Sequence, residues 1–443
     1  MNTSILLALL LALPAAAPAA PPVAPQDAAP EPPAAAPELT LEAALRELDA
    51  QSLTLVQARS RAGEAGALVR QSAAALLPTL SAQGTYLKNS EGVTLALPGG
   101  PERVIQPDQS LSVTATARVP LLVPTAWFDL AAARDAARSA ELGAEATRRT
   151  LRTGFAQSAH GAASAEEVVA ASERAVASAA ELVRSAERRV AAGTAAPLDV
   201  LKSRTEQVKR EGDLVAARAN LERARLALGI LLGRKEPVRV VVPDGAAAPA
   251  PELEMPAEAL AGEALEHRPE IAAQDAQVAA AEAGVRSAWA RLVPQLSASG
   301  AAFAADTPYV TGEKDGWRVT LDLTWSLYDG GFRYGKRRQA EAQATGARAG
   351  AEAQRLAVRQ EVEDGRRDLR VARERLRLAQ TQSQLAGETA ASARRSFEAG
   401  IASSLDVIDA NDREYLAEIG LADARARLAQ ARLALGRALG RDL

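Results

Sequence analysis

The chain has 443 residues, a net charge of −3 and no cysteine, and only 3% of its residues are aromatic although 48% are hydrophobic. The near balance of charge gives no basic surface for nucleic acid. The absence of cysteine excludes disulfides, thiolate nucleophiles and cysteine metal sites. Alanine carries much of the apolar fraction, which favours slender helix packing over a thick globular core.

The N-terminal residues are typical of an export signal. Residues 5–13 form an apolar run, and residues 15–20 are small residues and proline, as in a cleavage region. We therefore expect residues 1–20 to be a cleaved signal peptide, although the lack of Lys or Arg leaves an ordinary apolar helix as the alternative. Residues 21–38 are a Pro/Ala-rich leader that is expected to stay extended. No later apolar stretch approaches the length of a transmembrane helix.

The first half of the mature chain, residues 39–234, is expected to contain a helix, a β-hairpin, a long helix and a shorter helix. Thr40 is a candidate N-cap for the first helix, which is predicted over residues 39–76. Alternating side chains predict one strand from Thr79 and another over residues 111–119, joined by a loop over residues 91–110.

The long helix is predicted over residues 127–192. Its core positions step in sevens, as in a coiled coil, at Phe155, Ala162, Val169, Val176, Val183 and Val190. A second seam carries small residues at Ser158, Ala165, Ser172, Ala179, Ala186 and Gly193. A helix of this length is a strut or part of a tube wall rather than an element of a compact domain.

The same elements recur in residues 259–441, after a linker predicted over residues 235–258. Adding 207 to the first seam gives Val362, Leu369, Leu376, Ser383, Ala390 and Phe397, and the turn at Gly193 becomes Gly400. Residues 69–84 match residues 285–300 with an offset of 216, so the second hairpin is shorter. Its returning strand alternates from Val319 to Leu327. A repeat of this length indicates a duplicated domain.

Helix lengths and strand faces predict the architecture. In each half, two shorter helices sum to the length of the long one, so both hairpins are expected at one end and both glycine turns at the other. Four strands of about 10 to 12 residues match bilayer strands but cannot close a barrel, so we expect three copies to form a twelve-stranded barrel. Arg118, Arg318 and Asp322 are expected in its lumen. Four aromatic residues are expected at the periplasmic rim, namely Trp127, Trp325, Tyr328 and Phe332.

Several motifs resemble the TolC-like outer-membrane efflux proteins. They are the helix start His267–Ile271, the strand openings at Leu77 and Pro294, the strand exit Trp325–Gly331 and the paired Gly-x5-Asp-Val turns. The resemblance implies a mainly α fold with a membrane β-barrel, in which an antiparallel coiled-coil α-helical barrel continues a trimeric twelve-stranded β-barrel. It also implies a passive exit duct in the outer membrane, without cofactors or metal. Its partners would be a periplasmic adaptor and an inner-membrane pump.

The resemblance also places a gate at the glycine turns. It implies that Asp199, Asp406 and Asp409 ring the periplasmic aperture, and capping of the helix starts is a compatible role for them. Gly193 and Gly400 are the expected hinges. Three positions depart from the family pattern: Phe397 lacks a hydroxyl, Ala402 replaces a basic residue, and Lys202 stands where a second acid could lie. We therefore expect the contacts that hold the aperture closed to differ from those of the family.

Two other classes of function remain as alternatives. A soluble periplasmic coiled-coil adaptor or scaffold would account for the helices but not for four alternating strands. An enzymatic function is disfavoured, because the sequence shows no recognisable set of nucleophile, base or metal ligands. The sequence does not distinguish drugs, metal ions and proteins as the exported substrate.

Overall fold

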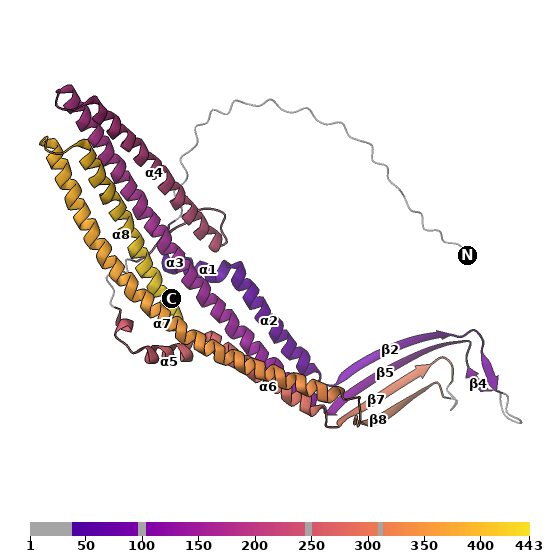
Figure 1. Ribbon diagram of the computed structural model, residues 1–443. Coiled ribbons are helices and arrows are strands. Elements are labelled where there is room, and N and C mark those ends of the chain that lie inside the picture. The colour runs from indigo at the N-terminus through magenta and orange to yellow at the C-terminus, as the bar shows by residue number, and fades with distance from the viewer. Residues whose placement is uncertain (1–37, 96–102, 244–249, 309–312) are drawn as a thin grey trace, which may run out of the picture. The chain divides into compact units, whose positions relative to one another are not determined.

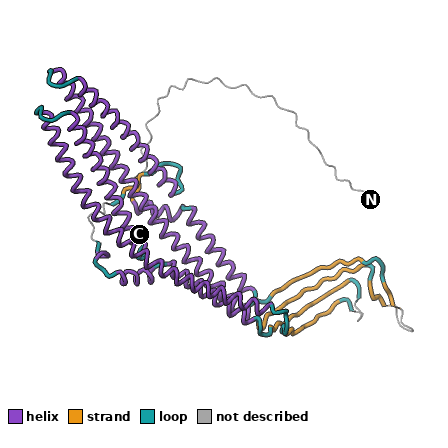
Figure 2. The backbone as a smooth tube through the Cα atoms, in the orientation of Figure 1, coloured by secondary structure: helices purple, strands orange, loops and turns teal. Residues whose placement is uncertain are grey.

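A computed structural model describes residues 38–95, 103–243, 250–308 and 313–443, so the predicted signal peptide and most of the leader lie outside the described residues. The described chain is mainly helical, as predicted (Figures 1 and 2). Its two long helices are α3 (Pro124–Ala191) and α7 (Phe332–Glu398), of 68 and 67 residues. The predicted repeat of one long helix in each half is therefore confirmed.

The two halves contain corresponding elements. The first half comprises α1 (Leu41–Gln51), α2 (Leu53–Ala74), β2 (Thr79–Lys88), β5 (Gln109–Leu122), α3 and α4 (Pro197–Leu231). The second half comprises α5 (Ala257–His267), α6 (Pro269–Ala290), β7 (Gln295–Ala305), β8 (Asp315–Thr324), α7 and α8 (Ser404–Ala438). The helices α4 and α8 both have 35 residues, the length expected from periodicity.

The prediction of one continuous helix over residues 39–76 is wrong, because the segment is broken into α1 and α2 at Ser52. The Thr40 side chain caps α1 by accepting a hydrogen bond from the Ala43 amide, as predicted. Ser52 has an extended backbone, and the break leaves both Leu48 and Leu55 buried. In the second half the corresponding break between α5 and α6 falls at Arg268, where the following proline favours an extended conformation.

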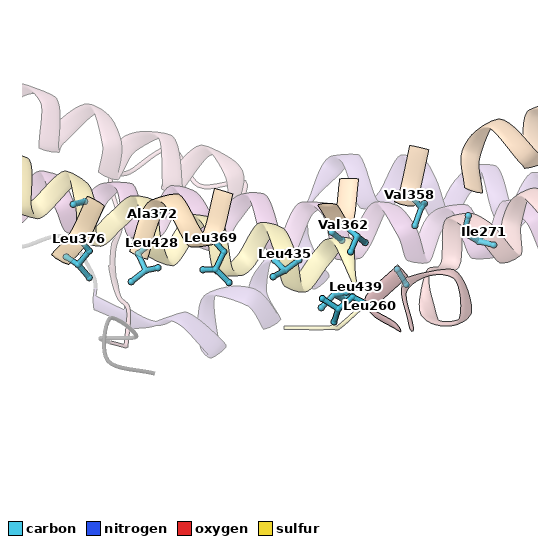
Figure 3. Close-up of a cluster of buried hydrophobic side chains, with 13 residues drawn as sticks. Leu260, Ile271, Val358, Val362, Leu369, Ala372, Leu376, Leu428, Leu435 and Leu439 are labelled. Atoms are coloured by element: carbon cyan, nitrogen blue, oxygen red, sulfur yellow. The ribbon is translucent and has the colours of Figure 1, made fainter. Parts of the chain in front are cut away.

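The short helices pack end to end along the long ones. Helix α3 contacts α2 and α4 on one side and α6 and α8 on the other, while α7 contacts α6 and α8. The order of neighbours is therefore α4, α3, α8, α7 near the glycine turns and α2, α3, α6, α7 nearer the sheet. Apolar side chains from α5, α6, α7 and α8 form the largest buried cluster, which includes Val362, Leu369 and Leu428 (Figure 3).

The predicted heptad seams are largely buried. On α3, Phe155, Ala162 and Val183 are buried while Val169 and Val176 are half-buried. In the second half, Val362, Leu369, Leu376, Ala390 and Phe397 are buried. Two positions of the small-residue seam are exposed rather than packed, namely Gly193, which lies in the turn, and Ser158. Its hydroxyl donates to the Gly154 carbonyl of its own helix, so it needs no partner across an interface.

The four long strands form one antiparallel sheet in the order β2, β5, β7, β8. Strand β8 ends at Thr324 and not at Leu327, because its partner β7 begins at Gln295, directly after Pro294, which cannot donate a backbone hydrogen bond. The predicted loop over residues 91–110 contains a small hairpin of β3 (Val93–Leu95) and β4 (Arg103–Gln106). These strands are too short for alternation to reveal.

The segment between the halves also contains short structure. Strand β6 (Arg239–Val241) pairs in parallel with β1 (Glu38–Thr40), and the 3-10 turn η1 (Pro251–Leu253) precedes α5. The predicted linker is therefore attached to the start of the first half. Across the described residues, no helix combines the length and the apolar character needed to cross a membrane.

Candidate functional site

The two glycine turns lie together at the end of the helices away from the sheet (Figure 1). Gly193 and Gly400 have φ values of 73° and 78°, which favour glycine at both positions. The residue after each glycine donates a backbone hydrogen bond to the last turn of the preceding helix. The Thr194 amide donates to the Arg189 carbonyl, and the Ile401 amide donates to the Ser396 carbonyl. Such turns reverse the chain within a few residues.

The helix starts after these turns hold two of the predicted aspartates. Asp406 forms a capping box with Ser403, whose backbone amide and hydroxyl both donate to its carboxylate. These two bonds, the amide first, lower the pKa of Asp406. Asp199 instead accepts a hydrogen bond of 2.8 Å from the hydroxyl of Ser404, on the other hairpin. The two carboxylates thus occupy equivalent positions but have different partners.

The other predicted gate residues, Asp409, Lys202 and Phe397, have different surroundings. Asp409 pairs with Arg413 one turn along α8, at 2.9 Å. Lys202 is exposed, and within the described part of the chain it has no ion-pair partner. Phe397 is only 4% exposed and packs against Leu182 and Val407, so within one chain its ring belongs to the core of the tip.

Like the bond from Ser404 to Asp199, two arginine contacts between the hairpins were not predicted. The Arg189 guanidinium lies over the Phe397 ring at 4.5 Å and donates to the Phe397 carbonyl at 2.7 Å. Further along, Arg210 of α4 is 3% exposed, pairs with Asp412 of α8 and lies over the Tyr415 ring at 4.6 Å. Glu206 and Asp213 also pair with Arg210 at helical spacings. That acidic spacing was the available sequence signal, but the contact with α8 required the fold.

The sheet gathers the predicted lumen residues on one face. Cross-strand pairing aligns Arg118 with Ser299 and Thr320, while Arg318 and Asp322 flank Thr320 at two-residue spacing on the same face. Arg118 donates to the Ser297 hydroxyl at 3.2 Å, and Asp322 accepts from Ser299 and Thr320. Serine, threonine and glutamine side chains make up much of the rest of this face.

The opposite face of the sheet is apolar and exposed. Leu80, Trp317, Val319, Leu321 and Leu323 expose between 65% and 81% of their surface. Among the described strands, neither β2 nor β8 has a partner along its outer edge. The predicted aromatic rim is also exposed, and the Trp325 indole donates to the Leu292 carbonyl where the sheet meets the helices. A single chain therefore leaves an apolar surface and two strand edges uncovered.

Solved structures share this fold. The outer membrane protein VceC from Vibrio cholerae is 20% identical, with a TM-score of 0.75 over 91% of this chain and 96% of that chain. The CmeC outer membrane channel of Campylobacter jejuni is 17% identical, with a TM-score of 0.76 over 90% of this chain and 85% of that chain. The MtrE outer membrane channel of Neisseria gonorrhoeae is 18% identical, with a TM-score of 0.73 over 90% and 89%. At these identities the likeness establishes a common fold.

Sequence comparison adds the family. No curated protein matches the chain significantly. The model of the outer membrane efflux protein family matches residues 44–234 and 260–441, which cover both halves and omit the segment between them. Members of this family are transport proteins and not enzymes. The chain therefore belongs to the outer membrane efflux protein family.

Proposed function

We propose that the protein is a trimeric exit duct of the outer membrane. The single observation that carries this proposal is the four-stranded sheet with one apolar face, one polar face and two unpaired edges. Unsatisfied backbone groups at a strand edge cost several kcal/mol each in lipid. Three copies of the sheet supply twelve strands, enough for a closed barrel with a water-filled lumen. Arg118, Arg318 and Asp322 would line that lumen.

The helices fit the same stoichiometry. Each chain contributes four neighbouring helices at every level, so three chains supply a wall of twelve around one axis. The duct conducts passively, and its cargo is selected by an inner-membrane pump joined through a periplasmic adaptor. The proposal includes export through the predicted signal peptide and its cleavage, and this segment lies outside the described residues.

The mass of the extracted protein tests this proposal. We expect the full chain to fractionate with outer membranes, to migrate differently on gels before and after heating, and to have the mass of three chains in mild detergent. A soluble, monomeric protein in the periplasm would instead favour a coiled-coil scaffold. That alternative leaves the exposed apolar face of the sheet without an explanation.

We further propose that the aspartates at the turns form the periplasmic aperture. Asp199, Asp406 and Asp409 from three copies bring nine carboxylates to one mouth, which favours cations over anions. Arg413 beside Asp409 and the exposed Lys202 partly offset this charge. Opening would splay the helices that follow Gly193 and Gly400.

Planar-bilayer recording tests the aperture. We expect cation selectivity and block by millimolar divalent cations from the periplasmic side, because several carboxylate oxygens bind the ion together. Asp406→Asn/Asp409→Asn should abolish the block, and each single change should weaken it less. Asparagine keeps an acceptor oxygen for the capping box at position 406. Asp423→Asn, about 25 Å further along α8, is the matched control. Unchanged block in the double variant would show that these residues only cap and pair.

A further inference from the structure

Positive charge is concentrated where the helices meet the sheet (Figure 1). Four segments join helices and strands there, namely residues 69–78, 123–136, 285–294 and 325–338. Together they contain eight basic and three acidic residues, a net charge of +5, although the whole chain has a net charge of −3. We call the eight basic residues of these segments the basic collar. A concentration of one sign of charge on a surface attracts groups of the opposite sign.

Several charges of the basic collar are not neutralised within the chain. One of the three acids, Asp329, is already paired with Arg333 at 2.8 Å. Arg291, Lys336 and Arg338 are exposed, and none of them has an ion-pair partner in the part of the chain that the structure describes. These three side chains are therefore available to an anion from outside the chain.

The start of α7 adds to the positive charge. Lys336, Arg337 and Arg338 lie in its first two turns, and the helix has neither an acidic residue in its first turn nor a side-chain cap at Gly331. The unpaired amides at a helix start carry partial positive charge, which disfavours cations beside them. An anion bound at this level would offset that repulsion.

Basic and aromatic side chains are paired in the same region. The Lys336 ammonium lies 5.8 Å from the centre of the Phe332 ring, and the Arg337 guanidinium lies 4.6 Å from the centre of the Trp289 ring. Both rings remain exposed, Phe332 by 59% and Trp289 by 48%. Aromatic rings and long basic side chains both concentrate at the headgroup level of a bilayer.

The basic collar directly adjoins the apolar face of the sheet. Leu323 and Trp325 continue the alternation of that face to the end of β8 and beyond it, and they are 65% and 57% exposed. The Trp325 indole donates to the carbonyl of Leu292, the residue after Arg291, at 3.1 Å. A molecule with an anionic head and an apolar tail would therefore meet complementary surfaces in both of its parts.

We propose that the basic collar binds the headgroups of anionic phospholipids in the periplasmic leaflet, with the acyl chains of these lipids against the apolar face of the sheet. The proposal rests on the membrane barrel proposed above and names the lipid that surrounds it. An acidic protein would satisfy the charges but would leave the adjoining apolar face uncovered. The attraction is electrostatic, so salt should weaken it.

Spin-labelled lipids test this inference on the full chain reconstituted in phosphatidylcholine bilayers. The measurement is the fraction of labelled lipid whose motion the protein restricts, in electron paramagnetic resonance spectra. At about 0.05 M salt we expect labelled phosphatidylglycerol to associate about threefold more strongly than labelled phosphatidylcholine. At about 1 M salt, where charges are screened within about 3 Å, the two lipids should associate equally. This comparison requires no variant.

A triple substitution locates the effect. Arg291→Gln/Lys336→Gln/Arg338→Gln removes three exposed charges of the basic collar and should reduce the preference for phosphatidylglycerol by about half or more.

The matched control is Arg359→Gln/Arg370→Gln/Arg375→Gln, which removes the same charge from α7 at least about 30 Å from the basic collar. These three arginines are also exposed and have no ion-pair partner among the described residues. The control should keep the preference of the natural chain.

The outcomes separate this inference from the proposed function. Equal association of the two lipids with the natural chain at low salt would overturn the lipid site, leave the basic collar to an acidic protein and leave the exit duct intact. Equal losses in the two triple variants would also overturn the site, because the preference would then come from the total charge. If the protein restricted neither lipid, it would not be embedded in the bilayer, and both proposals would fail.

Discussion

The helices α4 and α8 have the same length and corresponding positions in the two halves, yet their surroundings differ. Helix α8 lies between α3 and α7, so Tyr415, Ala417 and Ala422 are buried. Helix α4 lies at the edge of the row, and the counterparts Val208 and Val215 are exposed. The duplicated helices have thus diverged in burial: α8, with a helix on each side, buries these positions, whereas α4 at the edge of the row exposes two of their counterparts.

The divergence extends to polar groups. Arg210 of α4 reaches across to Asp412 of α8, whereas the corresponding residue of α8 is the buried Ala417. At the helix starts, α8 has a side-chain cap from Ser403, whereas α4 begins at Ala196 and Pro197 without one. The two halves therefore differ in their buried polar contacts and in their helix caps, and four sets of substitutions compare them.

The largest effect is expected where both halves bury the same position. Val183→Asp and its counterpart Ala390→Asp each place a carboxylate in a packed seam, and each should destabilise the protein by more than about 3 kcal/mol or prevent assembly. Val176→Asp should have a smaller effect because Val176 is half-buried. The free energy of unfolding in urea, followed by helical circular dichroism, measures the losses.

Arg174→Asp is the control on the outer face of α3. Arg174 is exposed and pairs with Glu418 at 2.9 Å, so the new carboxylate faces another acid and should cost about 1 kcal/mol or less. Losses as large as that of Val183→Asp would show that the seam has been assigned to the wrong face.

The second effect concerns a polar group that only the first half contains. Arg210→Met leaves the acidic groups of Glu206 and Asp412 without their buried partner and should cost about 2 to 4 kcal/mol. Arg204→Met, on the same helix, removes an exposed pair with Glu187 and should cost less than about 1 kcal/mol. Urea unfolding compares the two, and equal losses would show that the contact between α4 and α8 adds no stability.

Much of the fold follows from periodicity and repetition. Heptads predicted both long helices, and the matching helix lengths predicted both hairpins at one end, where their four strands form one sheet. Features that leave no periodic pattern in the sequence were not predicted. One is the break at Ser52, which lies between the buried Leu48 and Leu55. Another is the pairing of β6 with β1, which joins residues far apart in sequence. For the candidate site, the capping box at Ser403 was predictable from local spacing, whereas the contact of Arg189 with Phe397 depends on how two hairpins meet.

The third effect depends on pH. Glu145 in the first half is held mainly by a hydrogen bond from Arg148, which lowers its pKa to about 2 despite partial burial. Because the folded pKa lies below the unfolded value, the stabilisation is complete above about pH 5 and is lost as pH falls toward 2. With solvent screening, it should amount to about 1 kcal/mol at pH 7.

Glu145→Gln should therefore lower stability at pH 7 and reduce its decline between pH 5 and pH 3, as measured by urea midpoints. The counterpart in the second half provides the comparison, because Glu352 is 65% exposed and lies 3.5 Å from Arg355. Glu352→Gln should change stability by less than about 0.5 kcal/mol at either pH. An unchanged acid slope in Glu145→Gln would contradict the assignment.

The smallest effect is expected at the uncapped helix start. Ser403→Ala should destabilise α8 by about 1 kcal/mol, because the Asp406 amide loses its acceptor. Ala196→Ser should stabilise α4 by about 0.5 kcal/mol, since Asp199 stands three residues later and completes a second capping box. That new bond competes with the one from Ser404, so the gain is smaller than the loss at Ser403. If urea unfolding shows that Ala196→Ser loses stability, the bond from Ser404 to Asp199 between the hairpins is worth more than a helix cap.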